Sequence, residues 1–373
     1  MRSVACIIDG ASPGVAPILI TRDRDLGAKS AYPGLSGRWV DRGTSRIFYF
    51  RARRPGHWRL LWRELRGGRF DLLYVNSLWA PMSIVPILAV RMGLLRVEQV
   101  MVATRGECST GALSIKARKK RLFIAGWCRL LRGLGVQFHA TAELEAVDLR
   151  RVFPWAVVRI NTDQVDLPPE PVPAAEPPGE QARLVFVGRI AAMKNLALVL
   201  AALAGVRCPV ALDIYGPIED VGYWRRCQTL MAALPPTARV AYRGELPPAE
   251  VRGVIAGYDA LVMPTLGENF GHVIAESLSV SCPVMCSDRT PWTKVLAGGG
   301  GWVLPDLTAE ALAELIEEFV ALPGERRRAA RVAAGAAYQR WRRDRSEVNI
   351  LDEMRLAAGP ASRRVETVTR NAG

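Results

Sequence analysis

Long hydrophobic runs are scarce in this chain of 373 residues, although half of its residues are hydrophobic. The longest apolar stretch, Leu78–Val90, has 13 residues, contains two prolines and stops at Arg91. A helix needs about 20 apolar residues to cross a bilayer, so this stretch predicts no membrane span. The first residues lead into no sustained apolar segment, so we expect no signal peptide. The sequence therefore predicts a cytoplasmic protein.

Cysteine pairs and clusters of metal ligands are also missing from the sequence. The seven cysteines form no C-x-x-C pair, and no histidine lies near them at the spacing of a metal site. Cys282 and Cys286 flank a short apolar strand, so we expect buried free thiols in a reducing compartment. The sequence predicts no metal site.

Acidic residues are few in the first half of the chain. The net charge of the whole sequence is +14. Residues 1–170 contain 27 lysines and arginines against 14 acidic residues, a net charge of +13. The remaining residues contain 23 and 22 respectively and are nearly neutral. Excess charge of one sign on one half of a protein indicates a negatively charged partner for that half.

Two basic clusters mix arginine with apolar side chains. Nine arginines and one acid, Glu64, lie between Arg42 and Arg69, together with tryptophan and leucine, and residues 116–132 repeat the pattern. This composition is typical of helices that bind an anionic membrane surface, so we expect peripheral attachment to the inner face of the cytoplasmic membrane. A compositional bias is the alternative, because arginine outnumbers lysine 44 to 6. No nucleic-acid recognition motif accompanies the charge, so no nucleic-acid partner is expected.

Strand and helix patterns alternate along the chain, which predicts parallel sheets of α/β type. A proline-rich segment divides the chain into two units of similar size, each with the alternation of a Rossmann-like domain, and we expect a ligand-binding cleft between them. The predicted division is 1–166 for the first domain, 167–181 for a linker, 182–337 for the second domain, 338–358 for C-terminal helices and 359–373 for a disordered tail.

The nine-residue segment Glu268–Glu276 carries the strongest functional signal. It follows the apolar strand Ala260–Pro264 and continues as a helix through Leu278. A helix start presents free N–H groups and a partial positive charge, which suit a phosphate. A carboxylate beside such an anion site is better suited to accept hydrogen bonds from sugar hydroxyls. Phosphate and hydroxyl groups together suggest a sugar nucleotide.

A second segment supports this interpretation. The strand Arg183–Gly188 is followed by Arg189, and then by Lys194 and Asn195, where another helix starts. Glycine at a strand end followed by two cations suits an anion, because arginine presents a fork of donors and lysine a point charge. The alternative is that both cations are ordinary solvated residues of a strand–helix loop. The two segments in one chain, in this order, favour the anion site.

Together the two segments resemble the retaining glycosyltransferases of family 4, which have the GT-B fold of two Rossmann-like domains facing a central cleft. Three more segments share the likeness: Thr104–Glu107, Phe138–Glu145 and Asp288–Trp292. The resemblance implies transfer of a hexose from a nucleotide sugar to a growing, lipid-linked glycan with retention of configuration, in polysaccharide or lipopolysaccharide synthesis. It also implies that the C-terminal helices cross back to the first domain. The nucleotide sugar would be a substrate, so no cofactor is expected.

The resemblance assigns roles to residues of the second domain. Arg189 and Lys194 would stabilise the leaving β-phosphate. Glu268 would contact the hydroxyls of the donor sugar and Glu276 the ribose, although Glu276 could instead be an exposed helix residue. The remaining donor-binding residues would be Gly188, Asn269, Phe270 and Gly271, with Tyr215 and Gly244 lining the nucleobase pocket. We find no Asp-x-Asp pair of the kind that metal-dependent sugar transferases use, so we expect metal-independent transfer.

Polar residues follow two strands of the first domain. Asn76 comes after the strand 72–75, and Arg105 and Glu107 come after the strand 100–104. Open α/β sheets bind ligands at the carboxyl ends of their strands, so these side chains are expected to handle the acceptor or the transferred sugar. His139 could line the cleft with them or be a satisfied structural histidine.

The chain departs from the family at its beginning. The strand Ile18–Thr21 corresponds to the second strand of the fold and comes almost at once. We therefore expect the first domain to lack its first strand and the sequence to be truncated. A truncated, non-catalytic homologue is one alternative function. The other is a nucleotide-sugar epimerase on the same two-domain plan, although no histidine–carboxylate arrangement for proton transfer stands out.

Overall fold

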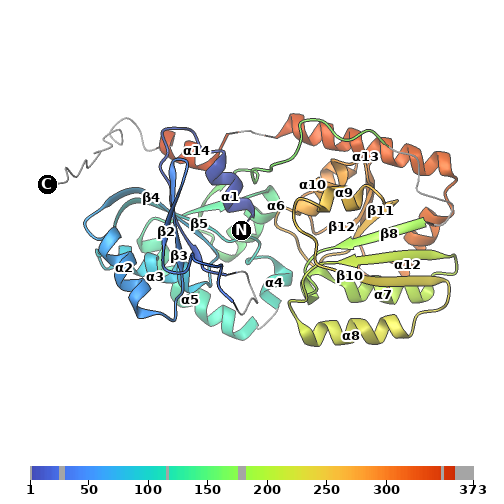
Figure 1. The fold of residues 1–373 in the computed structure, drawn as a ribbon, viewed down its shortest axis with the longest axis horizontal. Coiled ribbons are helices and arrows are strands. Elements are labelled where there is room, and N and C mark those ends of the chain that lie inside the picture. Colours follow the sequence, from blue (N-terminus) through green and yellow to red (C-terminus); the bar gives the residue numbers. More distant parts are fainter. Residues whose placement is uncertain (1, 25–29, 115–116, 175–181, 346–347, 358–373) are drawn as a thin grey trace.

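The computed structural model describes residues 2–24, 30–114, 117–174, 182–345 and 348–357. Two α/β domains follow one another along the chain, the first drawn in blue to cyan and the second in green to orange in Figure 1. The tail predicted for 359–373 and part of the predicted linker lie outside the described residues. Within the described ranges, no helix is both long and apolar enough to span a membrane.

The first domain contains two sheets. Its strands are β1 (Ile18–Arg22), β2 (Trp39–Arg42), β3 (Ser45–Phe50), β4 (Arg69–Asn76), β5 (Arg96–Ala103), β6 (Gln137–Ala140) and β7 (Val157–Ile160). One sheet has the order β1-β3-β2 and the other the order β4-β5-β6-β7. Only the β2–β3 pair among these is antiparallel. The helices are α1 (Arg2–Asp9), α2 (Pro55–Leu65), α3 (Pro81–Arg91), α4 (Thr110–Ser114), α5 (Ala117–Gly133) and α6 (Glu143–Val152).

The two sheets are not joined by hydrogen-bonded strands. Among the described residues β1 pairs only with β3, and β4 pairs only with β5, so each strand presents one unpaired edge. The structure shows these two edges, and the missing first strand stays a prediction.

Helices α2, α3 and α5 pack side by side on the first domain. Helix α2 begins at Pro55, whose fixed φ and missing N–H suit the first helical position. Met82 of α3 packs against the cluster that contains Leu61 of α2. Ile87 of α3 packs in a second cluster with Trp127 of α5. These contacts place the arginine-rich helices α2 and α5 and the more apolar helix α3 side by side on the outside of the first domain.

The second domain has one continuous sheet. Its strands are β8 (Ala182–Val187), β9 (Val210–Tyr215), β10 (Ala238–Gly244), β11 (Ala260–Met263), β12 (Val284–Ser287) and β13 (Gly301–Leu304). All neighbours in the order β10-β9-β8-β11-β12-β13 are parallel. Every residue of β11 and β12 is buried, as expected for central strands covered on both faces. Because strands buried on both faces need apolar residues at every position, their sequences are the continuous apolar runs from which we predicted them.

Helices cover both faces of this sheet. They are the 3₁₀-helix η1 (Ala192–Lys194), α7 (Leu196–Gly205), α8 (Val221–Ala232), α9 (Val251–Ile255), α10 (His272–Leu278), α11 (Thr293–Leu296), α12 (Ala309–Val320) and α13 (Gly324–Asp344). One core cluster gathers around Leu200 of α7 and Phe319 of α12. The other gathers around Ile274 of α10 and Tyr338 of α13.

The last helix returns to the first domain. Helix α14 (Ile350–Ala357) follows α13 and lies over the first domain in Figure 1. Its Ile350 and Met354 are buried against Ile7 of α1 and Met101 of β5. Residues from both ends of the described chain therefore complete one small core.

The strands predicted at Ile18–Thr21, 72–75, Arg183–Gly188 and Ala260–Pro264 lie within a few residues of β1, β4, β8 and β11. The differences elsewhere have physical causes. Strand β5 begins at Arg96 rather than Val100, because its first four positions alternate between exposed and half-buried and gave no apolar run. Strand β2 was missed because only its first two residues are apolar. It pairs with β3 across a tight turn at Gly43, which has a φ of 57°.

Candidate functional site

Two strand–helix loops of the second domain lie against each other, one after β8 and one after β11. Leu266 N donates to Met193 O at 2.9 Å, and Asn195 Nδ2 donates to Pro264 O at 3.1 Å. Asn195 has a φ of 57°, a left-handed conformation that asparagine tolerates better than most residues. These bonds bring the two sequence segments into one site.

Each cation predicted to bind phosphate has a carboxylate partner. Lys194 Nζ pairs with Glu268 Oε2, and the two side chains are 15% and 14% exposed. Arg189 pairs with Glu219, and its side chain is half exposed. The Lys194–Glu268 pair therefore lies inside the site, and the Arg189–Glu219 pair lies at its surface.

The loop that carries Glu268 is anchored to its own domain. Glu268 N donates to Arg289 O at 3.0 Å. Trp292, which is 2% exposed, donates from Nε1 to Phe270 O at 2.5 Å. Gly271 has a φ of 80°, where a side chain would be strained. Two hydrogen bonds and one glycine thus fix the backbone between Glu268 and α10.

Glu276 lies within α10, the helix that follows this loop. Its side chain is only 3% exposed, so the alternative of an exposed helix residue is wrong. A buried carboxylate requires hydrogen-bonding partners to remain charged. The role of Glu276 at a ribose stays a prediction.

Three glycines meet where β8, β9 and β10 end. Gly188 N donates to Tyr215 O at 3.0 Å, and Gly216 N donates to Gly244 O at 2.8 Å. A Cβ on Gly216 would lie 1.9 Å from Gly188 O, so only glycine fits. The Tyr215 hydroxyl lies 3.1 Å from that of Tyr258. The structure therefore brings Gly188, Tyr215 and Gly244 together at the carboxyl ends of three neighbouring strands.

Arg105 is the centre of a polar network in the first domain. Its Nε donates to Asn76 Oδ1 at 3.0 Å and its Nη2 donates to Tyr74 OH at 3.1 Å. Its Nη1 donates to Asp163 Oδ1 at 2.5 Å. The structure thus brings together two of the residues predicted on the acceptor side, Asn76 and Arg105, and commits the guanidinium to three partners.

His139 is buried in the same network, with both ring nitrogens occupied. Nδ1 lies 2.6 Å from Tyr74 OH, and Nε2 lies 2.7 Å from Asn161 O. Burial, together with the charge of Arg105, lowers the pKa of His139 to about 4. A neutral ring donates from one nitrogen and accepts at the other, which matches a carbonyl partner and a hydroxyl partner. This geometry favours the structural role among the two that the sequence left open.

Glu107 faces the turn after β4. Its Oε1 accepts from Ser77 Oγ at 2.7 Å and its Oε2 accepts from Leu78 N at 2.5 Å. Burial raises the pKa of Glu107. Both oxygens are occupied within the first domain, and acceptor binding by Glu107 stays a prediction.

Asp163 was missed by sequence reasoning. It is 1% exposed and accepts from Ser3 Oγ at 2.6 Å, while His272 Nε2 lies 3.5 Å from its Oδ2. Burial opposes ionisation, but the hydrogen bond with His272 and the charge of Arg105 outweigh it and hold the pKa of Asp163 below its ordinary value. One carboxylate thus joins α1, the turn after β5 and the start of α10. No motif around Asp163 signalled this role.

Metal-ligating residues are not clustered in the part of the chain that the structure describes, where no group of three or more histidine, cysteine, aspartate or glutamate side chains could hold an ion. Asp23 and Asp25 do form an Asp-x-Asp sequence, which the sequence expectation overlooked. Asp23 is buried and accepts from Arg24 Nε at 2.9 Å and from Ser36 Oγ at 2.7 Å. Asp25 lies outside the described residues. All seven cysteines are free thiols, Cys282 and Cys286 among the buried ones.

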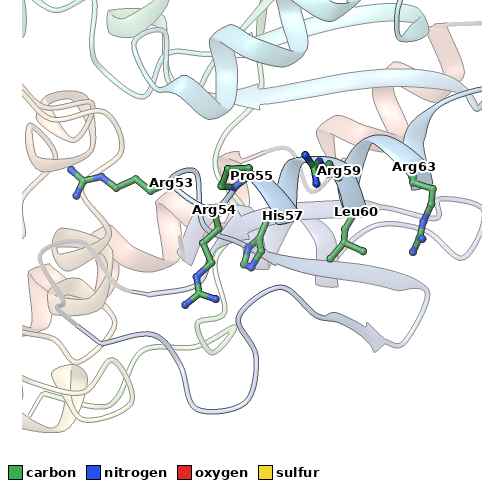
Figure 2. A pocket seen from close by; sticks show the side chains of 8 residues that line it. Arg53, Arg54, Pro55, His57, Arg59, Leu60 and Arg63 are labelled. Atoms are coloured by element: carbon green, nitrogen blue, oxygen red, sulfur yellow. The ribbon is translucent and has the colours of Figure 1, made fainter.

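A hollow lies on the outer side of the first domain, at the start of α2. It is lined by Arg53, Arg54, Pro55, Gly56, His57, Arg59, Leu60 and Arg63. Figure 2 shows Arg54, His57, Leu60 and Arg63 pointing to the same side of α2, as expected for residues three apart on a helix. Among the described residues, the four arginines of this hollow have no acidic partner. The hollow therefore presents unneutralised positive charge.

The second domain is similar to known proteins. Residues 172–335 match the family described as Glycosyl transferases group 1. Over 172 residues the chain is 26% identical to the putative colanic acid biosynthesis glycosyltransferase WcaL of Salmonella typhimurium. That match covers 44% of this chain and 41% of WcaL, so the chain spans less than half the length of the relative.

Solved structures resemble the whole fold. Sucrose-phosphate synthase from Thermosynechococcus elongatus has a TM-score of 0.70 at 16% identity, over 95% of this chain and 90% of that chain. Anabaena HepE in complex with UDP-glucose has a TM-score of 0.66 at 14% identity, over 83% of this chain and 85% of that chain. Identities this low show the fold alone. The chain has the predicted GT-B fold, and its residues 172–335 match the glycosyl transferases group 1 family.

Proposed function

We propose that this protein is a family 4 glycosyltransferase that transfers a hexose from a nucleotide sugar to a growing glycan with retention of configuration. The observation that carries the proposal is the Lys194–Glu268 ion pair inside the group 1 domain. A cation beside a carboxylate suits the two unlike parts of a nucleotide sugar, its diphosphate and its sugar hydroxyls. The relative WcaL is named for colanic acid biosynthesis, and HepE was solved with UDP-glucose, which supports this substrate class.

Donor binding must replace the carboxylate partners of Lys194 and Arg189 with the phosphates of the nucleotide sugar. Breaking the sugar–phosphate bond leaves negative charge on the β-phosphate of the departing nucleoside diphosphate. Lys194 and Arg189 can take that charge once the diphosphate replaces Glu268 and Glu219 as their partner. Glu268 is then free to accept hydrogen bonds from the sugar. Two cations at the leaving group support transfer without a metal ion.

The other predicted residues would serve binding. Glu276 would contact the ribose, and Tyr215 and Gly244 would border the nucleobase. On the first domain, Asn76 and Arg105 would face the acceptor, for which we propose a lipid-linked glycan. Arg105 already holds Asn76, so these two side chains would act together.

The experiment is a panel of nucleotide sugars offered to the purified protein, with binding followed by thermal shift and products followed by mass spectrometry. We expect one donor to bind and to lose its sugar to water or to a glycan acceptor, with EDTA present. A donor that keeps its nucleotide and returns as a different sugar would instead identify an epimerase. Binding without any turnover would identify a non-catalytic homologue, and strict dependence on Mg²⁺ or Mn²⁺ would contradict the metal-independent mechanism.

We also propose that the protein works at the inner face of the cytoplasmic membrane, with helices α2, α3 and α5 toward the lipid. The arginines of the α2 hollow are exposed, and so are Trp62 of α2, Met92 after α3 and Leu122 of α5. Figure 1 shows these helices along the lower side of the first domain, with α2 furthest from the second domain. Positive charge mixed with exposed apolar side chains supports binding to an anionic bilayer.

Vesicle binding tests this location. Vesicles of phosphatidylglycerol and phosphatidylcholine should bind the protein, and pure phosphatidylcholine should not. High salt should release it, because charges are screened beyond about 8 Å at physiological ionic strength. R54Q/R63Q should weaken binding, whereas R225Q/R226Q, which removes two exposed arginines of α8, should not. Equal loss in both double variants would mean that net charge matters and that this face does not.

A further inference from the structure

Glu145 of α6 is a buried carboxylate that no part of the donor-site argument uses. Its side chain is 5% exposed. Oε2 accepts from Thr141 N at 2.9 Å, which is the bond of an acidic residue in the first turn of a helix. Helix capping explains the bond to Thr141 but none of the bonds to residues distant in sequence. Glu145 has such partners in both domains.

Glu145 holds both chain neighbours of Arg105. Its Oε1 accepts from Thr104 Oγ1 at 3.0 Å and from Gly106 N at 2.8 Å. Arg105 between them has a φ of 53°, a left-handed conformation that costs free energy in a residue with a long side chain. The two bonds therefore fix the backbone that aims Arg105 at Asn76 and Asp163.

Glu145 also reaches the second domain. When the Asn269 amide is turned so that its nitrogen faces the first domain, Nδ2 donates to Glu145 Oε1 at 2.9 Å and to Thr141 Oγ1 at 3.0 Å, and it also contacts Glu145 Oε2. In the opposite orientation the amide oxygen would face only acceptors, so the hydrogen-bond geometry assigns the amide this orientation. Asn269 is the residue directly after Glu268.

The two chain segments are close enough for this contact to matter. A Cβ on Gly106 would lie 3.4 Å from Asn269 Cβ, and a Cβ on Gly111 would lie 2.7 Å from Leu266 O. The turn after β5 and the loop after β11 are therefore in van der Waals contact around the Glu145 carboxylate. Small residues on the first domain allow this approach.

We propose that Glu145 is a positioning residue that couples the two domains by holding Arg105 on one side and the Glu268 loop on the other. The roles of Arg105 and Glu268 rest on the proposed function, and the coupling itself does not. Every described partner of this carboxylate is an N–H or O–H donor on a strand end or loop. A carboxylate can satisfy all of them, whereas a glutamine would turn its NH₂ group toward other donors. With asparagine at position 269, a carboxylate therefore suits this position better than an amide.

The first test separates the coupling from the helix cap. N269A removes the bonds of the Asn269 amide to Glu145 and Thr141. It leaves intact the bonds of Glu145 to Thr104, Gly106 and Thr141, and also the bond from Thr141 Oγ1 to Asn269 O at 3.2 Å. We expect hydrogen exchange to rise about tenfold or more in residues 266–271 and also in residues 104–107 of the other domain. E143Q, which changes an exposed glutamate two residues earlier on α6, should change neither segment. A rise confined to 266–271 would overturn the proposal.

The second test reverses the polarity of the pair. N269D places a second carboxylate against Glu145 and should raise exchange in both segments more than N269A does. In E145Q/N269D the glutamine amide can donate to the aspartate, so exchange should fall below that of N269D. No recovery in the double variant would overturn the proposal even if each single variant behaves as expected.

Activity gives a third readout that depends on the proposed function. With the donor found in the nucleotide-sugar panel, N269A should lower kcat about tenfold with a smaller change in KM, because the Asn269 amide faces Glu145 and its loss disturbs the alignment of the two sides. A donor-binding role for the Asn269 side chain would instead raise KM. If the wild-type protein turns over no donor, the proposed function fails and hydrogen exchange still decides the coupling. If turnover is found and N269A leaves kcat unchanged, the coupling fails and the function stands.

Discussion

The two domains hold their predicted site residues by different means. The second domain is one continuous parallel sheet whose central strands are wholly buried, and its site residues lie on two adjoining loops. The first domain is two separate sheets, and its site residues depend on one another through Arg105. Nearly all of the net positive charge also lies in the first domain.

Because of this contrast, we expect charged residues of the first domain to affect mainly stability, and those of the second domain to affect mainly catalysis. Removing a charged side chain from the loops of the second domain should leave an apolar scaffold intact. Removing one from the network of the first domain should leave another buried charge without its partner. We therefore expect substitutions in the two domains to affect different measurements.

The largest expected effect breaks the network of the first domain. R105M leaves the Asp163 carboxylate buried without its guanidinium partner, and should cost about 4 kcal/mol of unfolding free energy. For domains of this size that corresponds to roughly 10 °C in melting temperature. Differential scanning calorimetry measures it. R207M, which breaks the exposed Arg207–Glu317 pair of the second domain, is the control and should melt like the parent.

A somewhat smaller effect is expected in the second domain, and in rate rather than stability. K194A should lower kcat by roughly a hundredfold, about 3 kcal/mol of barrier, because the leaving diphosphate loses a cation. Its melting temperature should stay close to that of the parent. K294A, on the exposed face of α11, should retain full activity. A K194A protein that is destabilised as much as R105M would remove the contrast between the domains.

The next prediction concerns how the unfolding free energy of the first domain depends on pH. His139 has a folded-state pKa of about 4, below its ordinary value of 6.5, because it is buried. The unfolded chain binds the proton first, so this contribution is complete above pH 6.5 and is lost as the pH falls toward 4. At pH 5 the loss is about 2 kcal/mol. Urea unfolding of the parent and of H139Q across this range measures it.

The H139Q protein should be less stable at pH 7 but should have a shallower dependence on pH between 6.5 and 4. Asp163 acts in a separate window, because its lowered pKa makes its contribution disappear only below its ordinary value of 3.8. Parallel pH profiles for the parent and H139Q would contradict a neutral, buried His139.

The smallest expected effect concerns the anchor of the donor loop. W292F keeps the aromatic packing against Phe270 and Trp341 but removes the hydrogen bond to Phe270 O. We expect a loss of about 1 kcal/mol of unfolding free energy and a modest loss of donor affinity. W302F, whose ring packs on Phe319 away from the loop, is the matched control. Thermal shift with and without donor measures both quantities.

The sequence predicted the second domain better than the first, and the reason is local patterning. Lys194 and Glu268 each follow an apolar strand closely, so their positions could be inferred from the chain around them. Asp163 and Glu145 draw their partners from distant segments: Ser3 lies 160 residues from Asp163, and Asn269 reaches Glu145 from the other domain. No local pattern records such contacts.

The same limit explains why the acceptor-side residues of the first domain were predicted only in part. The ends of β4 and β5 were predicted, and Asn76 and Arg105 do lie together there. The prediction placed Glu107 beside them as a ligand-facing residue and left His139 open between the cleft and a structural role. Both are occupied by partners in other turns and strands, Ser77 and Leu78 for Glu107 and Tyr74 and Asn161 for His139. A strand end can be read from sequence, but the hydrogen bonds of a side chain on it cannot.

The open edge of β1 affects how the protein behaves at high concentration. Among the described residues this strand pairs on one side only, and Ile18 is 39% exposed. Native proteins usually guard such an edge with lysine, proline or a covering segment, because its free N–H and C=O groups can recruit another strand. Here Pro17 and Arg22 guard the two ends, and three apolar residues lie between them. We therefore expect reversible self-association through this edge during purification and storage, growing with concentration.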